Sequence, residues 1–223
     1  MREASGLDPA FGLSKFLPIV GDDVIPVPTD EAIAAGAGAE VELLLGSTRE
    51  EMNIYFVPPG IIELDDAATI RFLLGQVYPR ADDALALYGL DDEKKAGAVL
   101  TEAMTDLVFR QPVREFALAH HGAAHVYEFG WRSPAFGGRL GACHALELPF
   151  VFDTLSSCSG PEGLVGEAPP QDLADHVHAL WVSFARDGSL PWSAFNAQTR
   201  NVYRLEERSA AFEGEFPAAQ LTV

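Results

Sequence analysis

The stretch VELLLGST, residues 41–48, is a continuous apolar run with the length of one β-strand, and Gly46 is expected to end that strand. A strand with one solvated face alternates apolar and polar residues, and this run does not alternate. Continuous apolarity is typical of a strand that is buried on both faces of a parallel sheet. The stretch therefore predicts a parallel sheet with helices on both of its faces.

Helix-like and strand-like patterns alternate along the rest of the chain. The spacing of apolar residues predicts helices over residues 30–35, 65–78, 81–90, 92–121 and 172–187. Asp65 or Asp66 is expected to cap the second helix and Asp172 the last, which Gly188 stops, while Pro112 kinks or divides the long one. Two further runs, at residues 124–131 and 201–207, are rich in β-formers and predict two more strands.

This order predicts an α/β fold in which a mostly parallel sheet is flanked by helices. Three strands are few for 223 residues, so we expect the sheet to be incomplete in this chain, with a strand edge and an apolar face uncovered. No repeat, low-complexity tract or linker divides the sequence. Residues 1–223 are therefore expected to form one unit without an internal boundary.

The chain is strongly acidic, with a formal net charge of −18. Binding to nucleic acid or to an anionic membrane needs a basic face, so neither partner is expected. No apolar run approaches the roughly 20 residues that span a bilayer, and the first residues, MREASGLDPAFGLSKF, lack the order of a signal peptide. Cys143 and Cys158 are too few for a disulfide scaffold. We therefore expect a cytoplasmic protein.

Two acids, Glu50 and Glu51, follow the strand of residues 41–48. In open α/β sheets, functional groups collect at the carboxyl ends of the strands, and an acid at such a place can orient an imidazole. The alternative is a solvated pair of acids that opens a helix and is stabilised by the helix dipole. The residue pattern alone leaves both interpretations open.

The stretch GACHALELPFVF, residues 141–152, places His144 in the loop after the second predicted strand, with Glu147 three residues later. His144 is either a structural histidine with a hydrogen-bond partner or a catalytic base. Cys143 is not expected to act with it, because adjacent side chains rarely point at each other and a thiol needs a placed base. No His or Cys spacing indicates zinc, and no cofactor is expected.

The stretch GACHALELPFVFDTL, residues 141–155, resembles the histidine segment of the type-B carboxylesterases, the family of bacterial para-nitrobenzyl esterases and animal cholinesterases. His144 falls on the catalytic histidine of that family. The residues that match its flanks are Glu147, Phe150, Val151 and Phe152. The resemblance implies an α/β-hydrolase fold, a small-molecule ester as substrate, and no metal or organic cofactor.

The stretch LLLGSTREEMNIYF, residues 43–56, resembles the segment of the same family that carries the catalytic acid. Glu51 falls on that acid and Glu50 on the acid before it, whereas Met52 stands where the family usually has glycine. Residues 16–26 and 180–207 also resemble family segments, in the same order along the chain. Residues 55–66, YFVPPGIIELDD, are expected to help form the wall of the pocket.

The nucleophile of such a hydrolase is a serine in a Gly-x-Ser-x-Gly turn, and it precedes the acid and the histidine. The sequence contains no such turn: neither Ser5, Ser14 and Ser47 before Glu51 nor the serines of LSSCSG after His144 stand in that frame, and the family's Gly-Gly oxyanion loop is also missing. The chain therefore resembles the C-terminal portion of a carboxylesterase, with two members of a Ser-Glu-His triad.

Such a chain is expected to be inactive alone and to associate with an N-terminal esterase half or with itself. Two alternatives remain open at this point. One is a non-catalytic, cholinesterase-like binding or interaction module. The other is an unrelated α/β domain in which His144 is structural.

Overall fold

The computed structural model describes residues 18–90 and 95–221. Within these ranges, one sheet has the strand order β1-β2-β3-β4, with bounds Leu43–Thr48, Ala124–Phe129, Asn201–Arg204 and Ser209–Phe212. β1 pairs with β2 and β2 with β3 in parallel, whereas β3 and β4 form an antiparallel hairpin. The predicted α/β class with a mostly parallel sheet is confirmed, and β4 is a strand that the expectation of three strands missed.

β1 departs from its prediction in two ways. It runs through Gly46 to Thr48, and only Ser47 and Thr48 are buried, because β1 pairs with β2 alone in the described part of the chain. The expectation of burial on both faces and the expected end at Gly46 were therefore wrong. Gly46 instead allows Tyr127 of β2 to lie close to the β1 backbone, since a Cβ at position 46 would collide with the carbonyl oxygen and the ring of Tyr127.

The predicted helices are present close to their expected positions, and two short helices, α2 and α7, were not predicted. Their bounds are α1 Thr29–Ala34, α2 Asn53–Phe56, α3 Ala67–Gly75, α4 Ala81–Leu87, α5 Ala96–Thr105, α6 Gln111–Ala119, α7 Leu148–Val151 and α8 Gln171–Asp187. A π-helical segment, η2, covers Asp106–Arg110 and joins α5 to α6. Residues 92–94 of the long predicted helix lie outside the described residues.

The predicted helix ends are confirmed in part. Asp66 caps α3 by accepting a hydrogen bond from the N–H of Ala68, and Gly188 ends α8 with a φ of 72°. Asp172 is not the N-cap of α8, because Pro170 holds that position and no side chain caps it. Pro112 is the second residue of α6, which continues directly from η2 with helical dihedrals at Arg110. The predicted kink or division of the long helix therefore takes the form of a π-helical irregularity just before Pro112.

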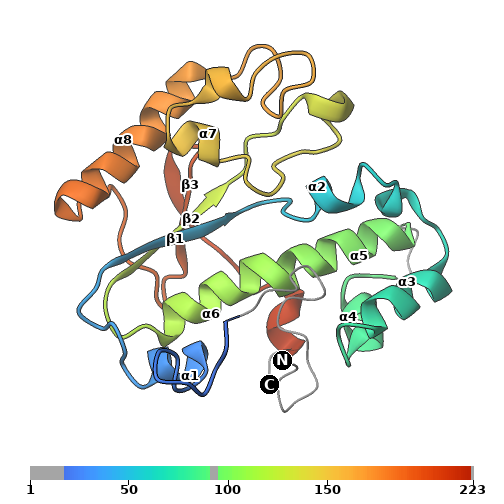
Figure 1. Ribbon diagram of the computed structural model, residues 1–223, viewed down its shortest axis with the longest axis horizontal. Coiled ribbons are helices and arrows are strands. Elements are labelled where there is room, and N and C mark those ends of the chain that lie inside the picture. The colour runs from blue at the N-terminus through green and yellow to red at the C-terminus, as the bar shows by residue number, and fades with distance from the viewer. Residues whose placement is uncertain (1–17, 91–94, 222–223) are drawn as a thin grey trace.

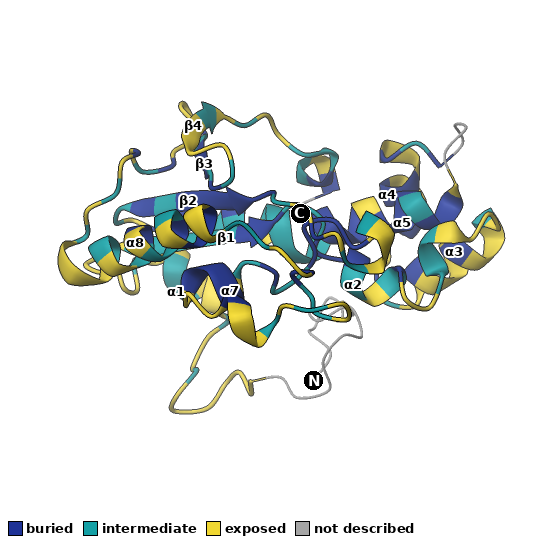
Figure 2. Cartoon of the chain, turned by 90° about the horizontal axis from the view of Figure 1, so that it is seen from above, coloured by how far each residue is buried: buried dark blue, intermediate teal, exposed yellow. Residues whose placement is uncertain are grey.

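Helices cover both faces of the sheet, with α7 and α8 on one side and α6 on the other (Figure 1). Successive residues of β2 face opposite sides. Tyr127 and Phe129 pack in one cluster with residues of α7 and α8, while Ala124 and Val126 pack in another with Ala117 of α6. Figure 2 shows β2 mostly buried, whereas the outward turns of α8 and α3 are exposed.

A further apolar cluster lies beside the sheet, where α3, α4 and α5 pack together. It includes Ile70, Leu85 and Val99 from the three helices, Met52 from the loop after β1, and Leu221 near the C-terminus. The loop after β1 is therefore fixed between the sheet and this cluster. No helix in residues 18–90 and 95–221 is both long and apolar enough to cross a membrane.

Candidate active site

The loop after β1 holds the Glu51 carboxylate in a fixed, buried position. Glu51 is 4% exposed, and its Oε1 accepts a hydrogen bond from the N–H of Thr48 at 2.6 Å. The N–H of the next residue, Met52, donates to Thr105 Oγ1 at 3.2 Å. With one oxygen bound to its own loop, Glu51 has its second oxygen, Oε2, available for another partner.

That partner is the imidazole of His144. The distance from His144 Nδ1 to Glu51 Oε2 is 2.7 Å, although 93 positions separate the two residues in the sequence. The N–H of His144 also donates to the carbonyl oxygen of Glu51 at 3.2 Å. Parallel pairing of β1 with β2 places both loops at the carboxyl ends of neighbouring strands. The structure therefore brings together the two residues that the sequence singled out.

Glu50 braces the same two loops from the other side. Its N–H donates to the carbonyl oxygen of Ala142, and its Oε2 accepts the N–H of Ala142 at 2.8 Å. It also pairs with Arg132, and a Cβ at Gly141 would collide with its carboxylate. The two adjacent acids thus have different surroundings, and the alternative of a solvated acid pair is wrong for the buried Glu51.

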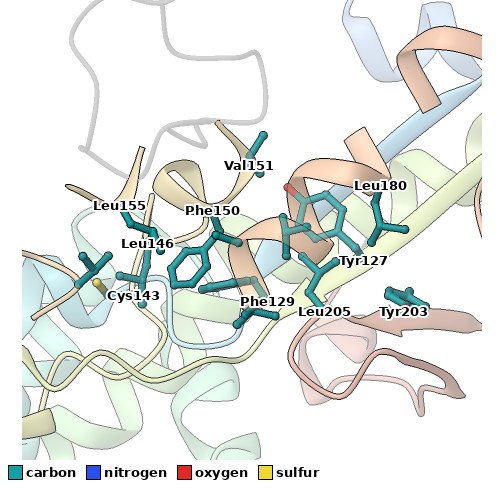
Figure 3. Close-up of a cluster of buried hydrophobic side chains, with 14 of the residues drawn as sticks. Tyr127, Phe129, Cys143, Leu146, Phe150, Val151, Leu155, Leu180, Tyr203 and Leu205 are labelled. Atoms are coloured by element: carbon teal, nitrogen blue, oxygen red, sulfur yellow. The ribbon is translucent and has the colours of Figure 1, made fainter. Parts of the chain in front are cut away.

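The histidine segment is anchored in the core on either side of His144. Figure 3 shows the side chains of Cys143, Leu146 and Phe150 pointing into the same apolar cluster as Phe129 of β2. The His144 side chain instead remains 41% exposed, and in the described part of the chain Nδ1 is its only ring nitrogen with a hydrogen-bond partner. The imidazole is thus held at Nδ1, while Nε2 has no hydrogen-bond partner among residues 18–90 and 95–221.

The surroundings raise the pKa of His144 above its usual value. The hydrogen bond with Glu51 is the main cause, partial burial opposes it, and the charges of Glu51 and Glu147 add to it. A carboxylate next to an imidazole favours the protonated ring in this way. The arrangement therefore supports an imidazole that takes up a proton readily.

Two other titratable groups flank His144. Burial is the main cause that raises the pKa of Glu147, and its Oε2 is buried without a hydrogen-bond partner among the described residues. Burial also raises the pKa of the Cys143 thiol to about 11, so the thiol is protonated at neutral pH. Cys143 is therefore poorly suited to act as a nucleophile, and both Cys143 and Cys158 are free.

Two aromatic rings lie against the imidazole. The centroid of the Phe109 ring is 5.0 Å from that of His144, and the centroid of Tyr55 is 5.8 Å away. Tyr55 belongs to the stretch expected to form a wall, one helical turn after Glu51. Phe109 lies in η2, and sequence reasoning missed it, because no local pattern distinguishes it from the other apolar residues of its helix.

Neither a nucleophile nor a metal site accompanies the pair within residues 18–90 and 95–221. No hydroxyl or thiol there hydrogen-bonds to His144, and Ser47 accepts a hydrogen bond from Arg114 instead. Ser5 and Ser14 lie outside the described residues. In the same ranges, no group of three or more His, Cys, Asp or Glu side chains could hold a metal ion.

A pocket of about 380 Å³ adjoins the loop of Glu51. It is lined by Glu50 and Asn53 of that loop, by α5 and η2, and by Arg132 and Arg139. Neither Glu51 nor His144 lines it. Its arginines are paired with carboxylates, so the pocket is a charged cavity beside the acid and base.

Comparison with known proteins gives consistent matches. The model of the "Carboxylesterase family" matches residues 2–221. The chain is 29% identical over 202 residues to the para-nitrobenzyl esterase of Bacillus subtilis (strain 168), which covers 86% of this chain and 39% of that protein. It is 26% identical over 206 residues to the phenmedipham hydrolase of Pseudarthrobacter oxydans, covering 87% of this chain and 41% of that protein.

Solved structures agree. A para-nitrobenzyl esterase structure superposes with a TM-score of 0.72 at 26% identity and covers 92% of this chain and 43% of that one. A carboxylesterase from Geobacillus stearothermophilus gives a TM-score of 0.61 at 27% identity, with coverages of 86% and 41%. The chain thus spans about two fifths of the length of these relatives.

Proposed function

Because the chain belongs to the carboxylesterase family, we propose that it supplies the acid and the base of a serine-type ester hydrolase. Glu51 is the orienting acid and His144 the general base. The observation that carries this proposal is the 2.7 Å contact between His144 Nδ1 and the buried Glu51 carboxylate. An acid that holds Nδ1–H leaves Nε2 available to exchange a proton with a nucleophile.

The nucleophile in this proposal is a serine outside the 223 residues, since the sequence has no Gly-x-Ser-x-Gly turn. The serine oxygen attacks the ester carbonyl, and Nε2 of His144 accepts the hydroxyl proton. His144 then gives that proton to the oxygen of the leaving alcohol as the ester C–O bond breaks, and the acyl group remains on the serine. A water molecule, deprotonated by His144, attacks this acyl group, and the carboxylic acid leaves as the proton returns to the serine oxygen. Glu51 remains ionised throughout, keeps the imidazole in one tautomer and stabilises the imidazolium.

The substrates in this proposal are small carboxylic esters, and para-nitrobenzyl esters are the first to test. Support comes from the name of the Bacillus subtilis relative and from the rings of Tyr55 and Phe109, which give the surroundings of His144 an apolar, aromatic character. An apolar wall beside the reacting atoms favours an aromatic alcohol or acyl group. The fold alone does not select among such groups.

A first experiment tests the location of the nucleophile. The purified 223-residue chain is incubated with a fluorophosphonate probe, which labels activated serines, and labelling is measured by mass spectrometry. We expect no stoichiometric labelling and no turnover of a para-nitrobenzyl ester by the chain alone. Labelling of a serine in this chain would contradict the proposed division of the triad.

A second experiment tests the roles of Glu51 and His144. The segment of the Bacillus subtilis esterase that matches this chain is replaced by the chain, and hydrolysis of a para-nitrobenzyl ester is measured. We expect the chimera to be active and His144→Ala to remove that activity. His178→Ala is the matched control, because His178 Nδ1 hydrogen-bonds to the backbone oxygen of Val151 at 2.8 Å and has no role in the proposed triad. A folded chimera without activity would favour the non-catalytic binding module instead.

A further inference from the structure

The helix that faces the imidazole is interrupted by a π-helical segment, η2, at Asp106–Arg110. The N–H of Gln111 donates to the carbonyl oxygen of Asp106, which is the i→i+5 bond of a π-turn. Such a segment contains one residue more than an α-turn and is rare, so it persists where surrounding contacts stabilise it. The contacts of η2 are therefore informative about what the segment does.

Two residues of η2 are anchored by buried charge pairs. Arg110 donates from Nη1 to Asp106 Oδ1 at 2.9 Å and from Nη2 to Glu128 Oε2 at 2.7 Å. The hydroxyl of Tyr88 donates to Asp106 Oδ2 at 2.7 Å, and Arg49 donates to the other oxygen of Glu128 at 2.9 Å. Asp106 and Glu128 are each 3% exposed, so the network fixes η2 to β2 and to α4.

Between these anchors, η2 presents Phe109 to the site. Its ring lies 5.0 Å from the imidazole of His144, with 45° between the ring planes. A single hydrogen bond at Nδ1 leaves the imidazole free to swing, because its terminal torsion has a broad energy minimum. Contact with a second ring removes much of that freedom, and aromatic rings pack favourably at such centroid distances.

We propose that η2 is a positioning device for the imidazole: Asp106 and Arg110 anchor the segment, and Phe109 is a positioning residue that restrains the His144 ring. The functional importance of this restraint rests on the proposed role of His144. The restraint itself is a physical contact and is tested without any hydrolysis assay, so its failure is distinguishable from failure of the proposed function.

The contact is tested by recording the imidazole resonances of the chain by NMR, with each histidine assigned by mutation. Phe109→Leu keeps an apolar side chain but removes the ring current, so the His144 resonances should shift while those of His125 do not. Phe184→Leu is the matched control, since the Phe184 ring lies 6.5 Å from His125. Unchanged His144 resonances in a folded Phe109→Leu chain would overturn the proposal.

The anchors are tested separately. Arg110→Met combined with Asp106→Asn releases η2 without leaving Asp106 as a buried charge that has lost Arg110, while Glu128 keeps its pair with Arg49. We expect the His144 resonances to shift or broaden although Phe109 and Glu51 are intact. Arg208→Met, which breaks the exposed pair with Asp172, should leave them unchanged. Should the double variant fold and keep the native His144 resonances, η2 would not be a positioning device.

Discussion

At the scale of single residues, the candidate site depends on how Glu51 divides its two oxygens. One accepts the N–H of Thr48 at 2.6 Å and the other contacts His144 Nδ1 at 2.7 Å. The first bond fixes the carboxylate, and the second fixes the tautomer and the charge of the imidazole. Changes at Glu51 should therefore appear in the titration of His144.

Glu51→Gln is expected to lower the pKa of His144, because the hydrogen bond with Glu51 is the main cause of its elevation. Glu147→Gln is the matched control and should lower this pKa less, since the charge of Glu147 makes the smallest contribution to its elevation. Both values are measured by NMR titration of the assigned imidazole. A larger effect of Glu147→Gln would contradict the assignment of Glu51 as the main partner.

The same pair predicts how stability depends on pH. Folding raises the pKa of His144, so the protonated imidazole paired with Glu51 stabilises the folded chain. This contribution to the unfolding free energy is fully present below the unfolded-state pKa of His144 and is lost as pH rises through its folded-state pKa. The difference in unfolding free energy between the chain and Glu51→Gln should therefore be larger near about pH 5 than near about pH 8. Urea denaturation at both pH values measures it, and a difference that grows with pH would contradict the sign.

The residues of the site were predictable to different degrees. Glu51 and His144 follow strands and stand in stretches that resemble a family, so the sequence identified them before their contact was known. Tyr55 lies in a stretch expected to form a wall. Phe109 was not predictable, because its place beside His144 depends on the π-turn of η2, and such a turn has no recognisable spacing of residues.

At the scale of elements, the contribution of helix ends to stability can be tested by substitution. Asp66 caps α3, with Oδ1 accepting the N–H of Ala68 at 3.0 Å and Oδ2 accepting the hydroxyl of Thr69 at 2.6 Å. Asp66→Ala is expected to lower the unfolding free energy by about 1 kcal/mol, as measured by urea denaturation. The neighbouring Asp65→Ala should have a smaller effect, and equal losses would contradict the cap.

The end of α8 depends on a glycine. Gly188 has a φ of 72°, a conformation that side chains disfavour, and a Cβ there would meet the carboxylate of Glu42. Gly188→Ala is therefore expected to destabilise the chain by about 1 kcal/mol. A Cβ at Gly75, in α3, would meet no atom within 4 Å. Gly75→Ala should therefore stabilise the chain by roughly 0.5–1 kcal/mol. The change in unfolding free energy is measured by thermal or urea unfolding. Changes of the same sign for the two variants would contradict the proposed role of Gly188.

Elements with strong local signals were predicted and weak ones were not. The helices around Ile70 and Val177 have regular apolar spacing, and both were found. β4 was missed because SAAF, residues 209–212, is short, rich in alanine and without alternation. Its formation depends on pairing with β3 across the turn at residues 205–208, which is a tertiary contact rather than a local preference.

At the scale of the whole molecule, β1 presents an open edge in the described part of the chain, with the exposed Val41 beside it. An unpaired strand edge is a template for another chain. We therefore expect the chain to bind a hydrophobic dye and to self-associate, as measured by fluorescence and by sedimentation velocity.

Val41→Lys tests whether that edge is responsible. A charge beside the edge should weaken the association, whereas Val182→Lys, on an exposed position of α8, should not. Val41 and Val182 are 52% and 47% exposed, so the two substitutions have similar local cost. A compact monomer without dye binding would contradict the expectation of an uncovered apolar face.

The parallel pairing of β1 with β2 also has a consequence for how the chain folds. Glu51 and His144 are 93 positions apart, and their contact requires β1 and β2, the strands that precede them, to pair in register. Closing such a long loop costs entropy before any contact repays it, and chains dominated by distant contacts fold slowly. The acid and the base should therefore come together late, and the resonances of His144 would serve as a reporter of the last step of folding.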